Sequence, residues 1–124
     1  MPFDTPLAAE IWEKKYRFRS DEGEDVDLAA TLSRVANAVA KAENPANRKV
    51  WRARFRDALT DFRFIPAGRI LAGAGTARNV TLFNCFVMGT LPDNLPGIFE
   101  HLREAAVTLQ QGGGVGMDFS TIRP

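Results

Sequence analysis

The residue with the most obvious chemistry is Cys85, the single cysteine among 124 residues. Its thiol has two interpretations: a small apolar side chain packed in a buried strand, or a redox-active or nucleophilic group. The neighbouring Phe83, Asn84 and Phe86 supply no cation that would stabilise a thiolate. The residues around Cys85 therefore leave both interpretations open, and packing is the simpler one.

A second feature is the glycine run GGGVG at 112–116. Phosphate-binding loops run from a strand through glycines into a helix, whose N-terminus faces the phosphate. Here the glycines follow a predicted helix and precede a predicted strand, which argues against such a loop. Consecutive glycines let backbone N–H groups approach a ligand, because no Cβ intervenes. The alternative is a helix-ending turn, and we favour ligand approach.

Other polar residues carry weaker signals. His101 has no second histidine, cysteine or carboxylate at metal-ligand spacing, so we expect a surface or helix-packing histidine and predict no metal site. The acidic stretch at 21–27 lacks the spacing of a calcium loop and is predicted to be a solvated loop. Arg69, Arg78 and Arg123 flank the glycine-bearing loops, where they could meet anions or face solvent.

Composition excludes several classes of protein. A hydrophobic content of 45% and a charged content of 25% are ordinary for a globular protein. The net charge of +1 gives no general reason to expect nucleic-acid or membrane binding. No apolar run approaches the roughly 18 residues that span a bilayer. A single cysteine and a polar N-terminal segment predict a cytoplasmic location.

Apolar spacing of three and four residues predicts helices separated by short breaks. The predicted helices span 5–16, 26–41, 48–62 and 96–111. Thr5 is the expected cap of the first, with Pro6 at its first helical position. The segment 64–79 is rich in glycine and is predicted to be a loop with a short helical turn.

Two strands complete the predicted elements. Residues 80–88 are rich in β-forming side chains and predict a buried strand, and 115–119 predict a second, shorter one. The order is a helical front followed by strand, helix and strand, so the fold is mainly α with a short β portion. A lone strand–helix–strand unit is typical of the opening of a larger α/β architecture, so we expect a piece of a longer protein.

Several motifs together resemble the large chain of ribonucleotide reductases, specifically the adenosylcobalamin-dependent class. They are NCF at 84–86, PDNLPGI at 92–98 and QGGGVGMDFSTIRP at 111–124, with IWEKKYRF at 11–18 and WRARFRDAL at 51–59 as weaker matches. The resemblance implies a helical domain, here 1–63, followed by the start of a ten-stranded α/β barrel at 64–124.

The family reaction replaces the ribose 2′-hydroxyl of a ribonucleotide with hydrogen, for DNA synthesis. The resemblance implies that a thiyl radical generated from adenosylcobalamin abstracts the 3′-hydrogen and that two further cysteines supply reducing equivalents. Cys85 matches the first member of that reducing pair. The other cysteines lie beyond Pro124 in the family, so the isolated chain is expected to be inactive and to bind no cofactor.

The resemblance also assigns binding roles, one position at a time. Asn84, Gly113 and Gly114 match backbone positions that face the substrate, and Asp93 and Arg123 match contacts of the effector nucleotide. Relatives often carry Ser or Thr where Gly68 stands in this chain, so contact with the substrate diphosphate there falls to backbone N–H groups or is lost.

The parent enzyme is expected to bind a ribonucleotide, a deoxynucleotide or ATP effector and a thioredoxin-type reductant, and to form a homodimer through the helix at 96–111. The resemblance leaves open whether the substrate is a diphosphate or a triphosphate. The competing hypothesis is a stand-alone, non-catalytic nucleotide-binding or interaction module derived from the same family.

Overall fold

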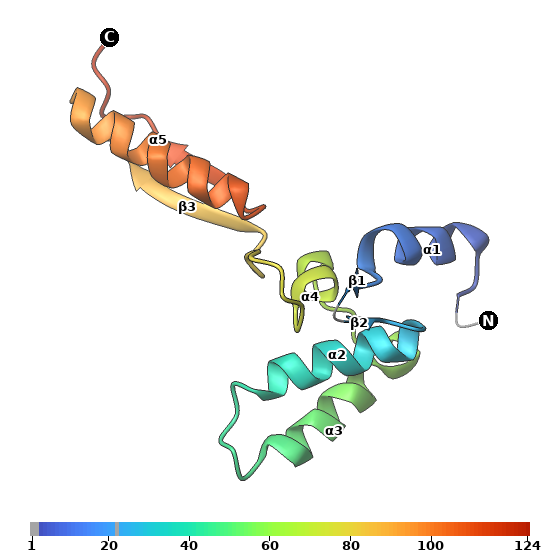
Figure 1. Ribbon diagram of the computed structural model, residues 1–124. Helices are drawn as coiled ribbons and strands as arrows, with labels where there is room; N and C mark the ends of the chain where they lie inside the picture. The colour runs from blue at the N-terminus through green and yellow to red at the C-terminus, as the bar shows by residue number, and fades with distance from the viewer. Residues whose placement is uncertain (1–2, 22) are drawn as a thin grey trace. The chain divides into compact units, whose positions relative to one another are not determined.

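The computed structural model describes residues 3–21 and 23–124, so Glu22, inside the acidic stretch, lies outside the described residues. Contacts divide the chain into two compact units, Met1–Ala77 and Arg78–Pro124. Figure 1 shows helices and a small hairpin in the first, and strands with one long helix in the second. The expected class, mainly α with a short β portion, is confirmed. The domain boundary predicted between residues 63 and 64 stays a prediction.

The first unit opens with helix α1 (Pro6–Ile11), which continues as the π-helical turn η1 (Trp12–Tyr16). Its start follows the predicted capping chemistry. Thr5 Oγ1 accepts a hydrogen bond from the Ala8 N–H at 3.1 Å, and a proline occupies the first turn. The side chain thereby satisfies one of the N–H groups that a helix N-terminus leaves without a partner.

A short antiparallel hairpin follows, made of β1 (Arg19–Ser20) and β2 (Gly23–Glu24). The prediction of a solvated loop holds for Asp21, Glu24 and Asp27, which are exposed, but it was wrong about the hairpin and about Asp25. The Asp25 N–H donates to the Phe18 carbonyl at 2.9 Å, which closes the hairpin, and Asp25 itself is buried. The acidic composition of this stretch does not reveal the arrangement, because among its described acids Asp25 alone is buried.

Helices α2 (Leu28–Ala40) and α3 (Arg48–Leu59) lie side by side (Figure 1). Asp27 caps α2, because its Oδ1 accepts a hydrogen bond from the Ala30 N–H at 2.7 Å. Both helices were predicted from their apolar spacing, and both are confirmed.

The C-terminal end of α3 differs from the prediction, which extended the helix to Phe62. A 3-10 turn, η2 (Thr60–Phe62), follows it, with φ values of 55° at Asp61 and 54° at Phe62. Left-handed backbone is unfavourable for side-chain-bearing residues and cannot continue a right-handed helix. The helix therefore ends at Leu59.

The core of the first unit forms where α2 meets α3 and the short helix α4 (Gly68–Gly73). Its buried apolar residues are Leu32, Val35, Ala36, Leu59 and Ala74. Full burial of one Val or Leu side chain contributes about 1.5 to 3 kcal/mol relative to exposure. This packing positions α4 against α2.

The second unit is the predicted strand–helix–strand: β3 (Cys85–Thr90), α5 (Leu95–Gln110) and β4 (Gly114–Asp118). The strands pair in parallel, as a helical crossover requires. β3 begins at Cys85 rather than residue 80, and its residues are exposed or half-buried rather than buried. Among the described residues β3 pairs with one strand, β4, whereas a buried parallel strand needs neighbours on both edges.

The described part of the chain contains no helix long and apolar enough to cross a membrane.

Candidate functional site

The cysteine lies at the start of the strand pair, directly opposite a glycine. Cys85 is the register partner of Gly114, whose N–H donates to the Asn84 carbonyl at 2.7 Å. The thiol is free and its residue is exposed. A Cβ added at Gly114 would lie 3.4 Å from Cys85 Sγ, an ordinary contact distance. The parallel ladder thus brings Asn84, Cys85 and Gly114 together at one point.

The glycine run forms the passage from α5 into β4. Gly112 has a φ of 83°, which ends the helix, and its N–H donates to the Leu109 carbonyl at 2.8 Å. The Gly113 N–H donates to the Thr108 carbonyl at 2.9 Å. The N–H groups of 112–114 are therefore all engaged within the chain, where they close the helix and start the strand.

Gly113 is buried beneath an aromatic ring. A Cβ at this position would lie 2.7 Å from Phe86 Cε2 and 3.0 Å from Thr108 Cγ2. Real Cβ atoms essentially never approach a neighbour as closely as the first of these distances. Glycine is therefore required at position 113 for the ring of Phe86 to pack between the strand and α5.

At the other end of the strands, a cluster of hydrogen bonds fixes the loop that leads into α5. The register is irregular between Val87 and Thr90, next to Gly89 with its φ of 85°. Thr90 Oγ1 then donates to Asp118 Oδ2 at 2.9 Å, and the Leu91 N–H donates to the Asp118 carbonyl at 2.9 Å.

Asp118 is held as a carboxylate by these neighbours. The Ser120 N–H donates to its Oδ1 at 2.9 Å and is the largest cause that lowers the pKa of Asp118, followed by the hydroxyls of Ser120 and Thr90. The hydroxyl of Thr121 also donates to the Leu91 carbonyl. The residues after β4 are thereby tied to the residues after β3.

Asp93 and Arg123, the expected effector contacts, meet at this end. Arg123 Nε lies 3.1 Å from Asp93 Oδ2 in an ion pair whose arginine is exposed and whose aspartate is half-buried. The neighbouring Asn94 caps α5 by accepting a hydrogen bond from the Gly97 N–H at 2.9 Å. β3 rises roughly 3.3 Å per residue, so Thr90, the strand end nearest this pair in sequence, lies on the order of 16 Å from Cys85. The two expected sites are therefore separate.

Gly68 belongs to the first unit, where it is the first residue of α4. A Cβ there would lie 3.2 Å from the hydroxyl oxygen of Tyr16, so the side chain of η1 comes close to the α4 backbone. His101, for which no metal role was expected, contacts the Gly97 carbonyl through Nδ1 at 3.1 Å. Among residues 3–21 and 23–124, no group of three His, Cys, Asp or Glu side chains is arranged to hold a metal ion.

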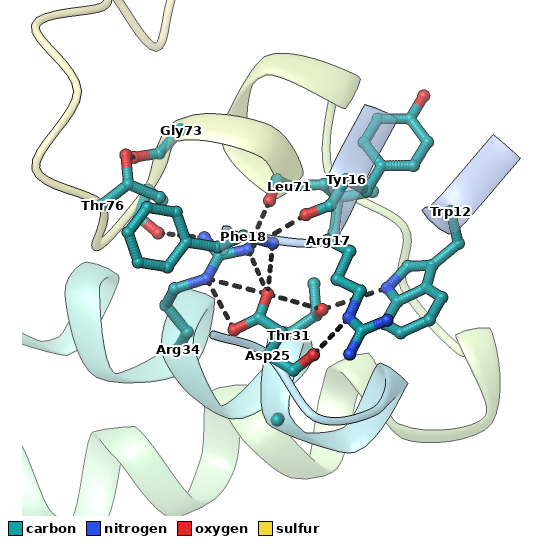
Figure 2. A network of polar contacts seen from close by, with 12 residues as sticks. Trp12, Tyr16, Arg17, Phe18, Asp25, Thr31, Arg34, Leu71, Gly73 and Thr76 are labelled. Carbon is teal, nitrogen blue, oxygen red and sulfur yellow. Dashed lines mark hydrogen bonds and ion pairs between the residues drawn. The ribbon is translucent and has the colours of Figure 1, made fainter. Parts of the chain in front are cut away.

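A buried polar network, which the sequence did not predict, positions α4 (Figure 2). Asp25 Oδ2 accepts hydrogen bonds from Arg34 Nη2 at 2.9 Å and from Thr31 Oγ1 at 2.8 Å. Arg34 also donates to the carbonyls of Leu71, at 3.0 Å, and Ala74, at the end of α4. One guanidinium thus joins the hairpin, α2 and the helix that begins with Gly68.

The same network extends to η1 and to Phe18, between η1 and β1, through two further contacts. The Trp12 indole N–H donates to Thr31 Oγ1 at 3.0 Å, and the Phe18 N–H donates to Asp25 Oδ2 at 3.1 Å. The signal in the sequence was the pair Thr31 and Arg34, two polar residues three positions apart among the apolar positions of α2. At this spacing they share a helix face, which indicates a buried polar contact.

Comparisons with known proteins agree with this arrangement of two units. Residues 2–79 match the family model described as ribonucleotide reductase, all-alpha domain, and residues 83–124 match ribonucleotide reductase, barrel domain. The expected helical domain followed by the start of a barrel is thus confirmed.

Individual relatives of this chain are named as ribonucleoside-diphosphate reductases. A vitamin B12-dependent ribonucleoside-diphosphate reductase of Mycobacterium tuberculosis is 32% identical over 94% of this chain, which spans 17% of that protein. One of Thermoplasma acidophilum with the same name is 37% identical over 57% of the chain and 9% of its own length. The ribonucleoside-diphosphate reductase subunit alpha of Helicobacter pylori is 39% identical over 56% of the chain and 8% of its own length. The all-alpha model alone covers more than half of the residues, and the chain therefore belongs to the ribonucleotide reductase family.

Proposed function

We propose that this chain acts as the N-terminal part of a vitamin B12-dependent ribonucleoside-diphosphate reductase. The relatives that carry this name, one of them similar over nearly the whole chain, support the proposal. Because the chain spans only 17% of the length of the first of these relatives, we assign the activity to the longer protein. The isolated chain is then inactive. A cytoplasmic location suits an enzyme that needs a reduced thiol.

Cys85 is proposed as one of the two thiols that reduce the substrate. In the net reaction two thiols lose two electrons and form a disulfide, while the ribose C2′–OH bond is replaced by C2′–H and the oxygen leaves as water. The observation that carries this role is the free, exposed thiol at the start of β3. The second thiol belongs to the remainder of the longer protein, and a thioredoxin-type dithiol reduces the disulfide again.

The neighbours of Cys85 suit contact with a ribonucleotide. Asn84 and Gly114 are fixed by one hydrogen bond beside the thiol, so this backbone is rigid before a substrate arrives. The N–H groups of Gly113 and Gly114 are engaged within the chain. We assign Gly114, beside the thiol, the role of admitting the substrate without a Cβ in the way, and Gly113, which lies beneath the Phe86 ring, the role of holding this ring beside the substrate-facing backbone. Gly68 is proposed to approach the substrate phosphates through its backbone.

The residues of this chain do not by themselves fit cobalamin. Its single histidine, His101, contacts the backbone of α5, and the described residues offer no cluster of metal ligands. We therefore assign adenosylcobalamin binding to the remainder of the longer protein and derive no step through it.

Asp93 and Arg123 are proposed to contact the effector nucleotide. They carry opposite charges and lie together, so a carboxylate for the ribose hydroxyls and a guanidinium for the phosphates are available in one place. An arriving nucleotide would have to break this surface ion pair. Surface pairs contribute only about 0 to 1 kcal/mol, so their loss is a small barrier to binding.

Helix α5 supports the expected homodimer. Of the predicted apolar face, Ala105 is buried against its own unit, while Leu102 and Leu109 stay 57% and 54% exposed. Leu95 and Phe99 extend this exposed row, at 70% and 63%. Residues 95, 99, 102, 106 and 109 alternate spacings of four and three, which is the pattern of a helix–helix seam. Sedimentation equilibrium of the chain tests this pairing: a monomer at every concentration would contradict it.

The decisive experiment on the function uses the longer protein with Cys85→Ser. Serine is close in size, so the fold should be retained, but the disulfide cannot form. We expect multiple turnover of a ribonucleoside diphosphate to be abolished, and turnover of the wild type to require added adenosylcobalamin. If the serine variant, supplied with an external dithiol, turned over as fast as the wild type, Cys85 would be only a packing residue.

A further inference from the structure

The positive charge of this chain is concentrated on one helix. The chain has a net charge of +1, but the sequence of α3, RKVWRARFRDAL, contains five cations and one carboxylate. Its first turn has no acidic residue and its N-cap residue, Asn47, makes no side-chain hydrogen bond to the helix. Arg48 and Lys49 thus occupy the end of a helix where anions are favoured and cations are not.

The cations of α3 line a groove shared with α2. A concavity of about 590 Å³ has Lys49, Arg52 and Arg56 on one wall, and Ser33 and Asn37 of α2 on the other. A second concavity of about 430 Å³ shares Asn37, Lys49 and Arg52 with the first. It continues the groove to Lys41 and Arg48. Both lie within the first unit.

These cations have no anion within the described residues. The side chains of Lys41, Lys49, Arg52 and Arg56 take part in none of the ion pairs that residues 3–21 and 23–124 form. The acidic residue of the groove, Asp57, pairs with Arg63 at 2.6 Å. Cations three and four positions apart on a helix repel each other. Repulsion among neighbouring cations that no anion of the chain relieves is typical of functional surfaces.

We propose that the groove between α2 and α3 binds a polyphosphate, the linear phosphate chain found in inorganic tripolyphosphate and in nucleoside triphosphates. Along the helix axis, about 4.5 Å separates Lys49 from Arg52 and about 6 Å separates Arg52 from Arg56. Each of these cations can therefore contact a different phosphate group. Guanidinium groups bind phosphate oxygens through two parallel hydrogen bonds. Asn37 and Ser33 offer neutral donors from the opposite wall.

The lining of the groove favours this ligand over a macromolecule. The larger concavity has no aromatic residue on which a nucleobase could stack, and its apolar contributions are two alanines, Ala36 and Ala53. Single-stranded nucleic acids bind through stacking, and protein partners bind through buried aromatic or long apolar anchors. The volume is that of a small-molecule site. None of the residues proposed for the reductase lies here, so this inference stands apart from that function.

The test is titration calorimetry of the whole 124-residue chain with inorganic tripolyphosphate at low salt. We expect saturable binding that Arg52→Gln and Arg56→Gln each weaken by about tenfold, the loss expected for one charge-assisted contact. The matched control is Arg54→Gln, on the same helix and with the same charge change, whose guanidinium stacks on Trp51 outside the groove. Circular dichroism verifies that every variant stays helical.

The results separate the proposal from its alternatives. Arg54→Gln should leave the affinity unchanged, and ATP should bind no more tightly than tripolyphosphate because the groove lacks a stacking surface. An equal loss in Arg54→Gln, or no binding at all, would overturn the proposal. Tighter binding of a DNA oligonucleotide or of poly-glutamate would also overturn it, in favour of a nucleic acid or an acidic protein partner.

Discussion

Arg34 Nη2 lies 2.9 Å from Asp25 Oδ2; the Asp25 side chain is buried, at 6% exposure, and that of Arg34 nearly so, at 11%. A buried ion pair is maintained only when hydrogen bonds satisfy its remaining polar atoms. Here Thr31, the Phe18 N–H and the carbonyls at the end of α4 do so (Figure 2). This pair is the point at which the hairpin, α2 and α4 are joined.

We predict that Asp25→Asn destabilises the chain by about 3 kcal/mol, because it leaves the Arg34 charge buried without its anion. The measurement is the free energy of unfolding in urea, followed by circular dichroism. The matched control is Glu24→Gln, one residue away on the exposed hairpin, which should change this free energy by less than about 0.5 kcal/mol. Equal effects of the two substitutions would contradict a structural role for the buried pair.

The buried carboxylate of Asp25 should make the folding stability depend on pH. Burial raises the pKa of Asp25, but hydrogen bonds from Arg34, the Phe18 N–H and Thr31, with the Arg34 charge, outweigh it and hold the pKa below its ordinary value. Because the folded pKa is the lower one, Asp25 contributes stability that is present above the unfolded pKa of about 3.9 and is lost as the pH falls through the folded pKa.

The stability difference between wild type and Asp25→Asn should therefore begin to narrow at about pH 5 and narrow further as the pH falls through the folded pKa. Urea unfolding at a series of pH values measures it. A difference that stays constant down to pH 3 would show that the Asp25 carboxylate is not linked to folding.

Substitution by alanine should change the free energy of unfolding differently at two glycines of the second unit. Gly113→Ala places a Cβ within 2.7 Å of the Phe86 ring and should destabilise the unit by about 1 to 3 kcal/mol, the range for overpacking. A Cβ at Gly116, three residues on within β4, would meet no atom within 4 Å, so Gly116→Ala should be neutral or slightly stabilising. Urea unfolding of both variants tests the pair. A neutral Gly113→Ala would mean that Phe86 moves freely.

The isolated chain should not reduce ribonucleotides, even with adenosylcobalamin and a dithiol. The proposed chemistry needs two thiols for the reducing pair, and this sequence has one. The assay is conversion of a radiolabelled ribonucleoside diphosphate, with Cys85→Ser as the control for background. Turnover above that background would require a mechanism that uses one cysteine.

Much of the local structure could be predicted from the sequence, because its causes lie within a few residues. Apolar spacing indicated α2, α3 and α5, and Thr5 with Pro6 marked the start of α1. The strand–helix–strand order followed from β-forming residues on either side of a helical pattern. The motifs around Cys85 and the glycine run were sufficient to predict the family that the comparisons identify.

Only the tertiary structure decided the roles of the charged residues. Among the acids at 21–27, burial of Asp25 depends on Arg34, which approaches it only after α2 and the hairpin have packed together. Arg52 and Arg56 look like a solvated helix face in the sequence, and become one wall of a groove because α2 lies alongside. The sequence alone determined the three longest helices and the strand–helix–strand order, since hydrogen bonding and side-chain spacing act locally, but not the hairpin or the end of α3. Charge pairing and burial required the packed structure, because they depend on contacts between residues far apart in the chain.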